Sequence, residues 1–194
     1  MEEFKSKLSL QDEIDEDEGS CNPSDLLNLL QNFLLIQQRR ALAYSNLKRG
    51  FTEYVSSGDE CAFQRLCGEI TQEFNNCSKT VIGMESQLRA RDDLAQILRS
   101  IQAREKEKLH LTATIQVLKK AGRPSERLAG NEKPETKDSC EISEASGAED
   151  AAYDNALNEA IRGVQDAVTS INELLEEVAY EIADLQSQLN REYD

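Results

Sequence analysis

The chain has 194 residues, of which 39% are hydrophobic, and it carries a formal net charge of −15 without any tryptophan. This length suits one ordinary domain with tails, and the five Phe and five Tyr are too few for a large aromatic core. Five cysteines, an odd number at spacings that match no disulfide framework, indicate a reducing compartment rather than a disulfide-stapled secreted domain.

Residues 1–21 predict a disordered acidic tail. The run 12–18 holds six acidic residues and one isoleucine, a composition that buries too little apolar surface to fold. Two glutamates follow Met1, where a secretory signal needs basic residues and an apolar run, so secretion is not expected. The most apolar stretch, 26–36, is far shorter than a bilayer span, so no membrane association is expected.

A first helix is expected over about 22–56. Pro23 suits its first turn, and Gly58 tolerates the left-handed conformation that ends helices. Its apolar stripe is interrupted at Gln37 and Arg40, so the seam of this helix is imperfect.

The second helix, about 60–90, carries a cleaner seam, because apolar residues recur in steps of four and three from Phe63 to Leu88. The next position in that phase is Arg91, and the two aspartates after it can cap a new helix. A tight turn is therefore expected near 90–93, and one continuous helix is the alternative.

The third helix is expected over about 93–121, ended by Gly122 and Pro124. Its middle, 102–108, is almost wholly charged or polar. Because the connections are short, the three helices are expected to be antiparallel neighbours, a domain spanning 22–122.

Residues 123–148 are rich in Ser, Glu, Lys, Gly and Pro, which predicts a flexible linker, and a long helix follows over 149–192. Ten apolar positions of this helix alternate in steps of four and three, the pattern of a seam that packs against another helix. These candidate partner-binding residues are Leu157, Ile161, Val164, Val168, Ile171, Leu175, Val178, Ile182, Leu185 and Leu189. The predicted fold is all-α: an antiparallel long-helix bundle or coiled coil with a disordered acidic N-terminal tail and linker.

The partner of this seam is left open by the pattern. The linker is long enough for the last helix to return to the first helix, whose broad apolar stripe needs cover, and the same pattern suits a dimer. In either case the surface that it binds is expected to be helical protein.

The residue patterns of catalysis are missing. His110 is the only histidine, no Cys-x-x-Cys pair occurs, and no glycine-rich phosphate loop is present. We therefore expect no enzyme activity, no cofactor, no metal and no small-molecule substrate. Isolated glycines inside the helical patterns either permit close helix approach or cost about 1 kcal/mol each relative to Ala; they are Gly50, Gly68, Gly83 and Gly163.

Charge is distributed unevenly along the chain. Residues 86–134 hold 11 basic and 6 acidic residues, whereas 135–194 hold 3 and 16. A modest basic face on the third helix is thus available to phosphate, but no aromatic residues interleave with it for base stacking. Direct nucleic-acid binding is the less specific alternative, and its candidates are Lys106, Lys108, Lys119, Lys120 and Arg123, with Arg127 nearby.

An ordered set of small residues, a turn and seam positions marks the first two helices and the start of the third. They are Arg40-Ala41-x-Ala43, Leu47, Gly50, Tyr54-x-Ser56-Ser57-Gly58, Phe63-x-Arg65, Ile70-Thr71-x-x-Phe74 and Leu98-Arg99-Ser100-Ile101-Gln102. This set resembles the required-for-excision one-B domain, a eukaryotic family named for a DNA-repair requirement. The resemblance covers roughly 24–124 and implies participation in DNA excision repair in the nucleus. It offers no catalytic motif to carry over.

Two functions follow as expectations. The first is a non-enzymatic helical adaptor that supports DNA excision repair through protein–protein contacts. The alternative is a structural subunit of a larger coiled-coil assembly, such as a transport or transcription complex, with only an indirect effect on repair. The resemblance implies the nucleus, and the composition leaves the cytoplasm open.

Overall fold

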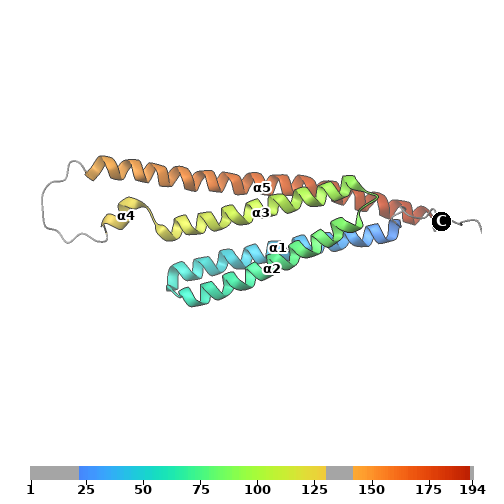
Figure 1. The fold of residues 1–194 in the computed structure, drawn as a ribbon, viewed down its shortest axis with the longest axis horizontal. Helices are drawn as coiled ribbons and strands as arrows, with labels where there is room; N and C mark the ends of the chain where they lie inside the picture. The colour runs from blue at the N-terminus through green and yellow to red at the C-terminus, as the bar shows by residue number, and fades with distance from the viewer. Residues whose placement is uncertain (1–21, 130–141, 193–194) are drawn as a thin grey trace, which may run out of the picture.

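The computed structural model describes residues 22–129 and 142–192, and every regular element in these ranges is a helix (Figure 1). In chain order the elements are α1 Pro23–Ser57, α2 Glu60–Gln87, α3 Asp92–Ala121, α4 Pro124–Ala129 and α5 Ile142–Glu192. The all-α prediction is confirmed. The tail expected at 1–21 lies outside the described residues.

Side-chain caps and one glycine determine where α1 and α2 begin and end. The Asn22 side chain accepts a hydrogen bond from the N–H of Ser24 at 3.0 Å and so starts α1. Gly58 ends α1 with a φ of 74°, a left-handed conformation that costs other residues energy. Asp59 then accepts from the N–H of Ala62 at 2.9 Å and caps α2. With only Gly58 and Asp59 between them, the two helices lie antiparallel.

The chain turns between α2 and α3, where the phase of the second seam fails. Helix α2 ends at Gln87 and α3 begins at Asp92. Arg91 holds this turn, since its guanidinium pairs with Asp93 at 2.8 Å and with Glu181 of α5 at 2.6 Å. Hydrogen bonds to these two carboxylates raise the pKa of Arg91. The turn is thereby tied to the last helix.

The bounds expected for the linker, 123–148, are wrong at both ends. Its start is helix α4, because Pro124 has the fixed φ that suits a first helical turn. Its last residues belong to α5, which begins at Ile142 rather than near 149. No proline interrupts these residues, and a helix extends at low cost once it is nucleated. Residues 130–141 lie outside the described ranges.

The four long helices form two antiparallel pairs, α1 with α2 and α3 with α5 (Figure 1). All four meet at the end of the molecule where α1 begins and α5 finishes. Toward the opposite end the two pairs diverge. Helix α3 packs far more extensively on α5 than on α2. The last helix is thus a full member of the bundle, and its intramolecular docking is the alternative that the chain adopts.

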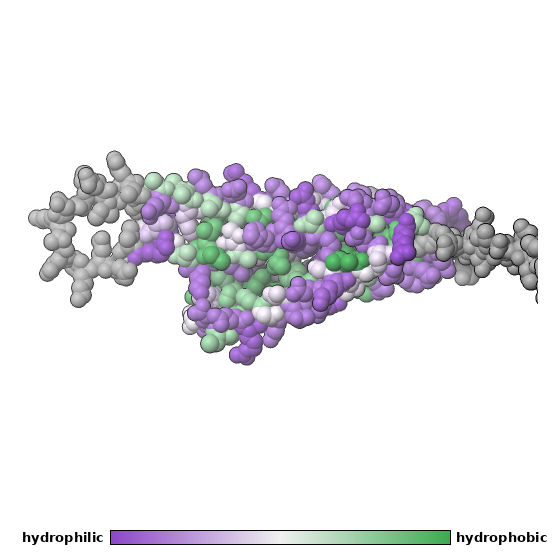
Figure 2. Space-filling model, viewed as in Figure 1, coloured by the Kyte–Doolittle hydropathy of each residue, from purple (hydrophilic) through white to green (hydrophobic). Residues whose placement is uncertain are grey.

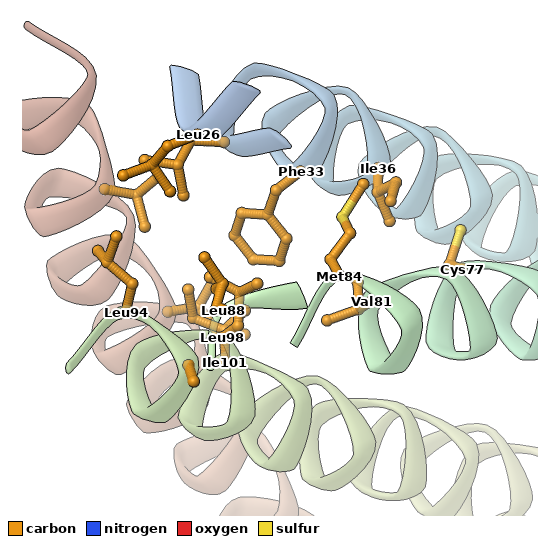
Figure 3. Close-up of a cluster of buried hydrophobic side chains, with 14 of the residues drawn as sticks. Leu26, Phe33, Ile36, Cys77, Val81, Met84, Leu88, Leu94, Leu98 and Ile101 are labelled. Carbon is orange, nitrogen blue, oxygen red and sulfur yellow. The ribbon is translucent and has the colours of Figure 1, made fainter. Parts of the chain in front are cut away.

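The main core lies at the end where the four helices meet, and Figure 3 shows labelled side chains of α1, α2 and α3 converging there. Helix α5 closes it with Ile171, Val178 and Leu185. The remaining buried members are Leu26, Leu30, Phe33, Ile36, Cys77, Val81, Met84, Leu88, Leu94, Ala95, Leu98 and Ile101. Since each helix contributes to this one cluster, its burial couples the stabilities of the four.

A polar layer lies between the main core and a smaller apolar cluster shared by α1 and α2. Its centre is Arg40, only 1% exposed, which donates hydrogen bonds to Gln102 of α3 and, at 3.5 Å, to Ser78 of α2. Burial lowers the pKa of Arg40, and the nearby charge of Glu105, itself 6% exposed, opposes this shift. The polar interruptions of the first and third helices therefore face each other.

The isolated glycines divide into two kinds. A Cβ on Gly50 would lie 2.0 Å from Cδ2 of Leu66 on α2, and a Cβ on Gly163 would lie 2.6 Å from Cδ1 of Leu111 on α3. Nothing lies within 4 Å of a Cβ on Gly68 or Gly83. The first two permit close helix approach, whereas the other two are merely tolerated.

Replacing Gly50 with valine is expected to lower the free energy of unfolding by about 1–3 kcal/mol, because the new side chain overpacks the contact between α1 and α2. Gly68→Val, a matched control on the open face of α2, is expected to change it by less than about 0.5 kcal/mol. Urea unfolding followed by circular dichroism measures both. Equal losses in the two variants would contradict the close approach at Gly50.

Candidate partner-binding site

The C-terminal half of the predicted α5 seam is buried within this chain. Ile171, Val178 and Leu185 are each less than 5% exposed and belong to the main core. Leu175 and Ile182 are half-buried against it. Leu189, the last of the ten, is half-buried. This half of the seam therefore already has its partner, the chain's own bundle.

The N-terminal half of the seam is covered less completely. Leu157, Ile161 and Val164 are half-buried, and Val168 is 37% exposed. The buried positions here are two small residues that the sequence pattern does not contain, Ala160 and Ala167. Gly163 lies between them, and its missing Cβ leaves room for Leu111 of α3. The larger apolar side chains are consequently turned to the edge of the contact between α3 and α5.

An open groove lies beside this edge, between the diverging helix pairs. Figure 2 shows hydrophobic side chains gathered between the two pairs, toward the end where they separate. We call this open groove the lysine groove. Its volume is about 480 Å³. It is lined by Tyr44, Lys48, Phe51 and Thr52 of α1, by Lys108, Thr112, Ile115, Gln116 and Lys119 of α3, and by Ile161 and Val164 of α5.

The lysine groove is positive in an acidic protein. Three lysines and no acidic residue are among the described residues that line it, although the whole chain has 37 acidic and 22 basic residues. Lys48 and Lys119 are exposed and form no ion pair with any side chain in the described ranges. The charge of these two ammonium groups is therefore available to an anionic ligand.

Lys108 and Tyr44 form the inner end of the groove and connect it to the polar layer. The Lys108 ammonium lies 3.1 Å from Glu105 and 4.0 Å from the centre of the Tyr44 ring. The Tyr44 hydroxyl donates to the backbone carbonyl of Glu105 at 3.2 Å. Burial, followed by the charge of Glu105, raises the pKa of Tyr44, so its hydroxyl stays protonated. This end of the groove is held in one arrangement.

The other lysines and the arginine proposed for nucleic acid are not gathered on one face. Lys106 lines a crevice of about 410 Å³ between α2 and α3, away from the lysine groove. Lys120 pairs with Glu60 at 3.0 Å, and Arg123 pairs with Asp154. Of the five candidates the groove contains two, Lys108 and Lys119, and it adds Lys48, which the sequence did not single out.

The described residues offer other chemistry little support. Among them, no group of three or more His, Cys, Asp or Glu side chains is placed to hold a metal ion. No helix in those ranges is long and apolar enough to span a bilayer. Cys77 is buried in the main core, and its burial raises the pKa of its thiol, which makes it less reactive.

Residues 28–119 match the family model described as DNA repair REX1-B. The predicted resemblance is confirmed. A required for excision 1-B domain-containing protein of Bos taurus is 34% identical over 96 residues, which are 46% of this chain and 53% of that protein. The Mus musculus protein of the same description is 31% identical over 99 residues, 48% of this chain and 59% of that protein. No solved structure matches the chain.

The REX1-B match and the lysine groove overlap in part. The chain spans between half and three fifths of the length of the two curated relatives it matches. The matched segment 28–119 contains the α1 and α3 walls of the groove, including all three lysines. The α5 wall lies outside the matched segment. The matched segment therefore supplies the charge of the groove, and α5 supplies one apolar edge.

Proposed function

We propose that this chain is a non-enzymatic helical adaptor that supports DNA excision repair by contacting another protein. The match of residues 28–119 to a family described by DNA repair carries the proposal. The lysine groove supplies the physical means, since its half-exposed apolar side chains lie on an open surface beside free cations. A repair role implies work in the nucleus.

Cells that lack this chain are expected to remove ultraviolet lesions from their DNA more slowly in darkness than parental cells. The measurement is a time course of remaining lesions, read with lesion-specific antibodies, and re-expression of the full chain is the control. Because an adaptor assists other proteins, we expect a slower rate rather than a complete block. Removal at the parental rate would rule out the repair role.

Crosslinking and mass spectrometry on the tagged full chain, purified from its own cells, is expected to identify the partner. Crosslinks within the chain should join α5 to α3, because these helices pack together. Crosslinks to another protein should involve the lysines of α1 and α3, since Lys48 and Lys119 are exposed in the groove. A stoichiometric set of coiled-coil proteins without repair functions would instead support the structural-subunit alternative.

The burial of α5 weighs against that alternative. A subunit of a coiled-coil assembly offers its apolar seam to other chains. Here Ile171, Val178 and Leu185 are already buried in the chain's own core. Of the ten seam residues, Ile161 and Val164 line the lysine groove, which is shorter than the seam.

A further inference from the structure

We infer that the lysine groove binds an acidic amphipathic helix from a partner protein. An adaptor of the proposed kind needs such a surface, so this assignment rests on the proposed function. Three properties of the groove select the ligand: its charge, its apolar floor and its length.

The charge selects an acidic ligand. Lys48 on the α1 wall and Lys119 on the α3 wall are both exposed, and no carboxylate lines the groove among the described residues. A ligand with Asp or Glu on both flanks would meet one lysine on each wall. A basic ligand would meet like charges, which disfavours its binding.

The floor selects apolar side chains between those acids. Phe51 of α1, Ile115 of α3 and Val164 of α5 line the groove, and all three are half-buried. Covering them would remove apolar surface from water, the main driving force of association. A helix that presents apolar residues at i, i+3, i+4 and i+7 matches such a floor.

The length selects a helix of about three turns. On α3 the lining positions Lys108, Thr112, Ile115 and Lys119 follow helical spacing and so share one face. From Lys108 to Lys119 this face is about 16 Å long at 1.5 Å per residue. A ligand helix of similar length reaches both ends.

A nucleic acid fits the groove less well than a helix does. Phosphate binding needs cations but gains nothing from an apolar floor. The remaining predicted cations do not extend the groove, since Lys120 and Arg123 are engaged by Glu60 and Asp154. The three lysines are thus too few to follow a phosphate backbone.

A phage-displayed library of random peptides of about 16 residues, a length that allows four helical turns, tests the assignment. The library is selected on the full chain, and the selected peptides are synthesised and titrated by fluorescence anisotropy. The groove variant is Lys48→Glu with Lys119→Glu, and both side chains are exposed. The matched control is Lys79→Glu with Lys106→Glu, also exposed, which changes the net charge equally outside the groove.

The enriched peptides are expected to be acidic and to carry apolar residues at helical spacing. The groove variant should bind them at least about tenfold more weakly, while the control stays within about twofold, because only the groove variant places like charges against the ligand. Enriched basic peptides, or equal losses in both variants, would overturn the assignment. So would a duplex of about 20 base pairs that binds the chain and loses the same affinity in the groove variant.

Cells lacking the chain separate this assignment from the repair role. Re-expression of the control variant is expected to restore lesion removal, whereas re-expression of the groove variant is not. Full restoration by the groove variant would overturn the groove as the working surface and leave the repair role intact. Normal repair without the chain would overturn the repair role, while the peptide titration would still decide the ligand.

Discussion

Replacing Val178 with aspartate is expected to lower the free energy of unfolding by about 3–5 kcal/mol, the cost of leaving an unpaired charge in a protein interior. Val178 is fully buried in the main core, in the same cluster as Leu98 of α3. For a chain of this size the loss corresponds to a melting temperature lower by about 6–20 °C. Thermal unfolding followed by circular dichroism measures it.

Ala179→Asp is the matched control for Val178→Asp, because Ala179 is exposed on the next position of the same helix. We expect it to change the free energy of unfolding by less than about 0.5 kcal/mol. Trypsin provides a second readout, since Arg162 is exposed on α5 and its peptide bond is protected while the helix stays docked. If both variants melted and were cleaved alike, α5 would not be part of the bundle.

The burial of the C-terminal half of the α5 seam was predictable because the pattern that indicates it is local. Apolar residues in steps of four and three define one helix face whatever that face touches. Ile171, Val178 and Leu185 are buried for this reason. The pattern did not identify the covering helix, because periodicity indicates which face of a helix is apolar and not which helix packs on that face.

The packing of the N-terminal half of the α5 seam was not predictable by the same rule. Ala160 and Ala167 are the buried positions there, and hydropathy does not distinguish an alanine that faces a helix from one that faces water. Gly163 leaves room for Leu111 of α3, and the larger side chains of Ile161 and Val164 line the groove. The seam pattern therefore marked the large apolar residues of this half without indicating that they are only partly covered.

The groove itself depends on the divergence of two helix pairs, which no single helix encodes. Lys108 and Lys119 stood out as part of a basic stretch, but Lys48 lies where acidic and basic residues balance. Lys48 is recognisable as a groove residue only in the fold, where it lies on the α1 wall and Lys119 lies on the α3 wall. A signal was present in the spacing of Tyr44, Lys48 and Phe51, which share one face of the first helix.

The polar layer shows the same limit. Gln37 and Arg40 were visible as interruptions of the first seam, and 102–108 as an interruption of the third helix. Neither interruption indicates, by its residues or spacing, that it contacts the other. The structure pairs them because a buried guanidinium needs acceptors, and Gln102 and Ser78 provide these from two other helices.

Replacing Arg40 with alanine is expected to lower the free energy of unfolding by about 3–5 kcal/mol, a large share of the stability of an ordinary domain. The variant loses a fully buried side chain and leaves Gln102 without the guanidinium to which it is bonded. It also removes one positive charge near the buried carboxylate of Glu105, which keeps its ion pair with Lys108 at 3.1 Å. Urea unfolding followed by circular dichroism measures the loss.

Arg49→Ala is the matched control for Arg40→Ala, because Arg49 lies on the same helix with its side chain 71% exposed. Its partners, Glu53 at 4.0 Å and Asn46 at 3.0 Å, are neighbours on that helix, and both contacts are exposed. Its loss is expected to cost less than about 0.5 kcal/mol, as for other exposed pairs. Both variants lose one positive charge. If Arg40→Ala lowers the free energy of unfolding by several kcal/mol more than Arg49→Ala does, the burial and hydrogen bonds of Arg40 account for the difference. Equal effects would mean that the helices are held by their apolar cores, with the polar layer adding nothing.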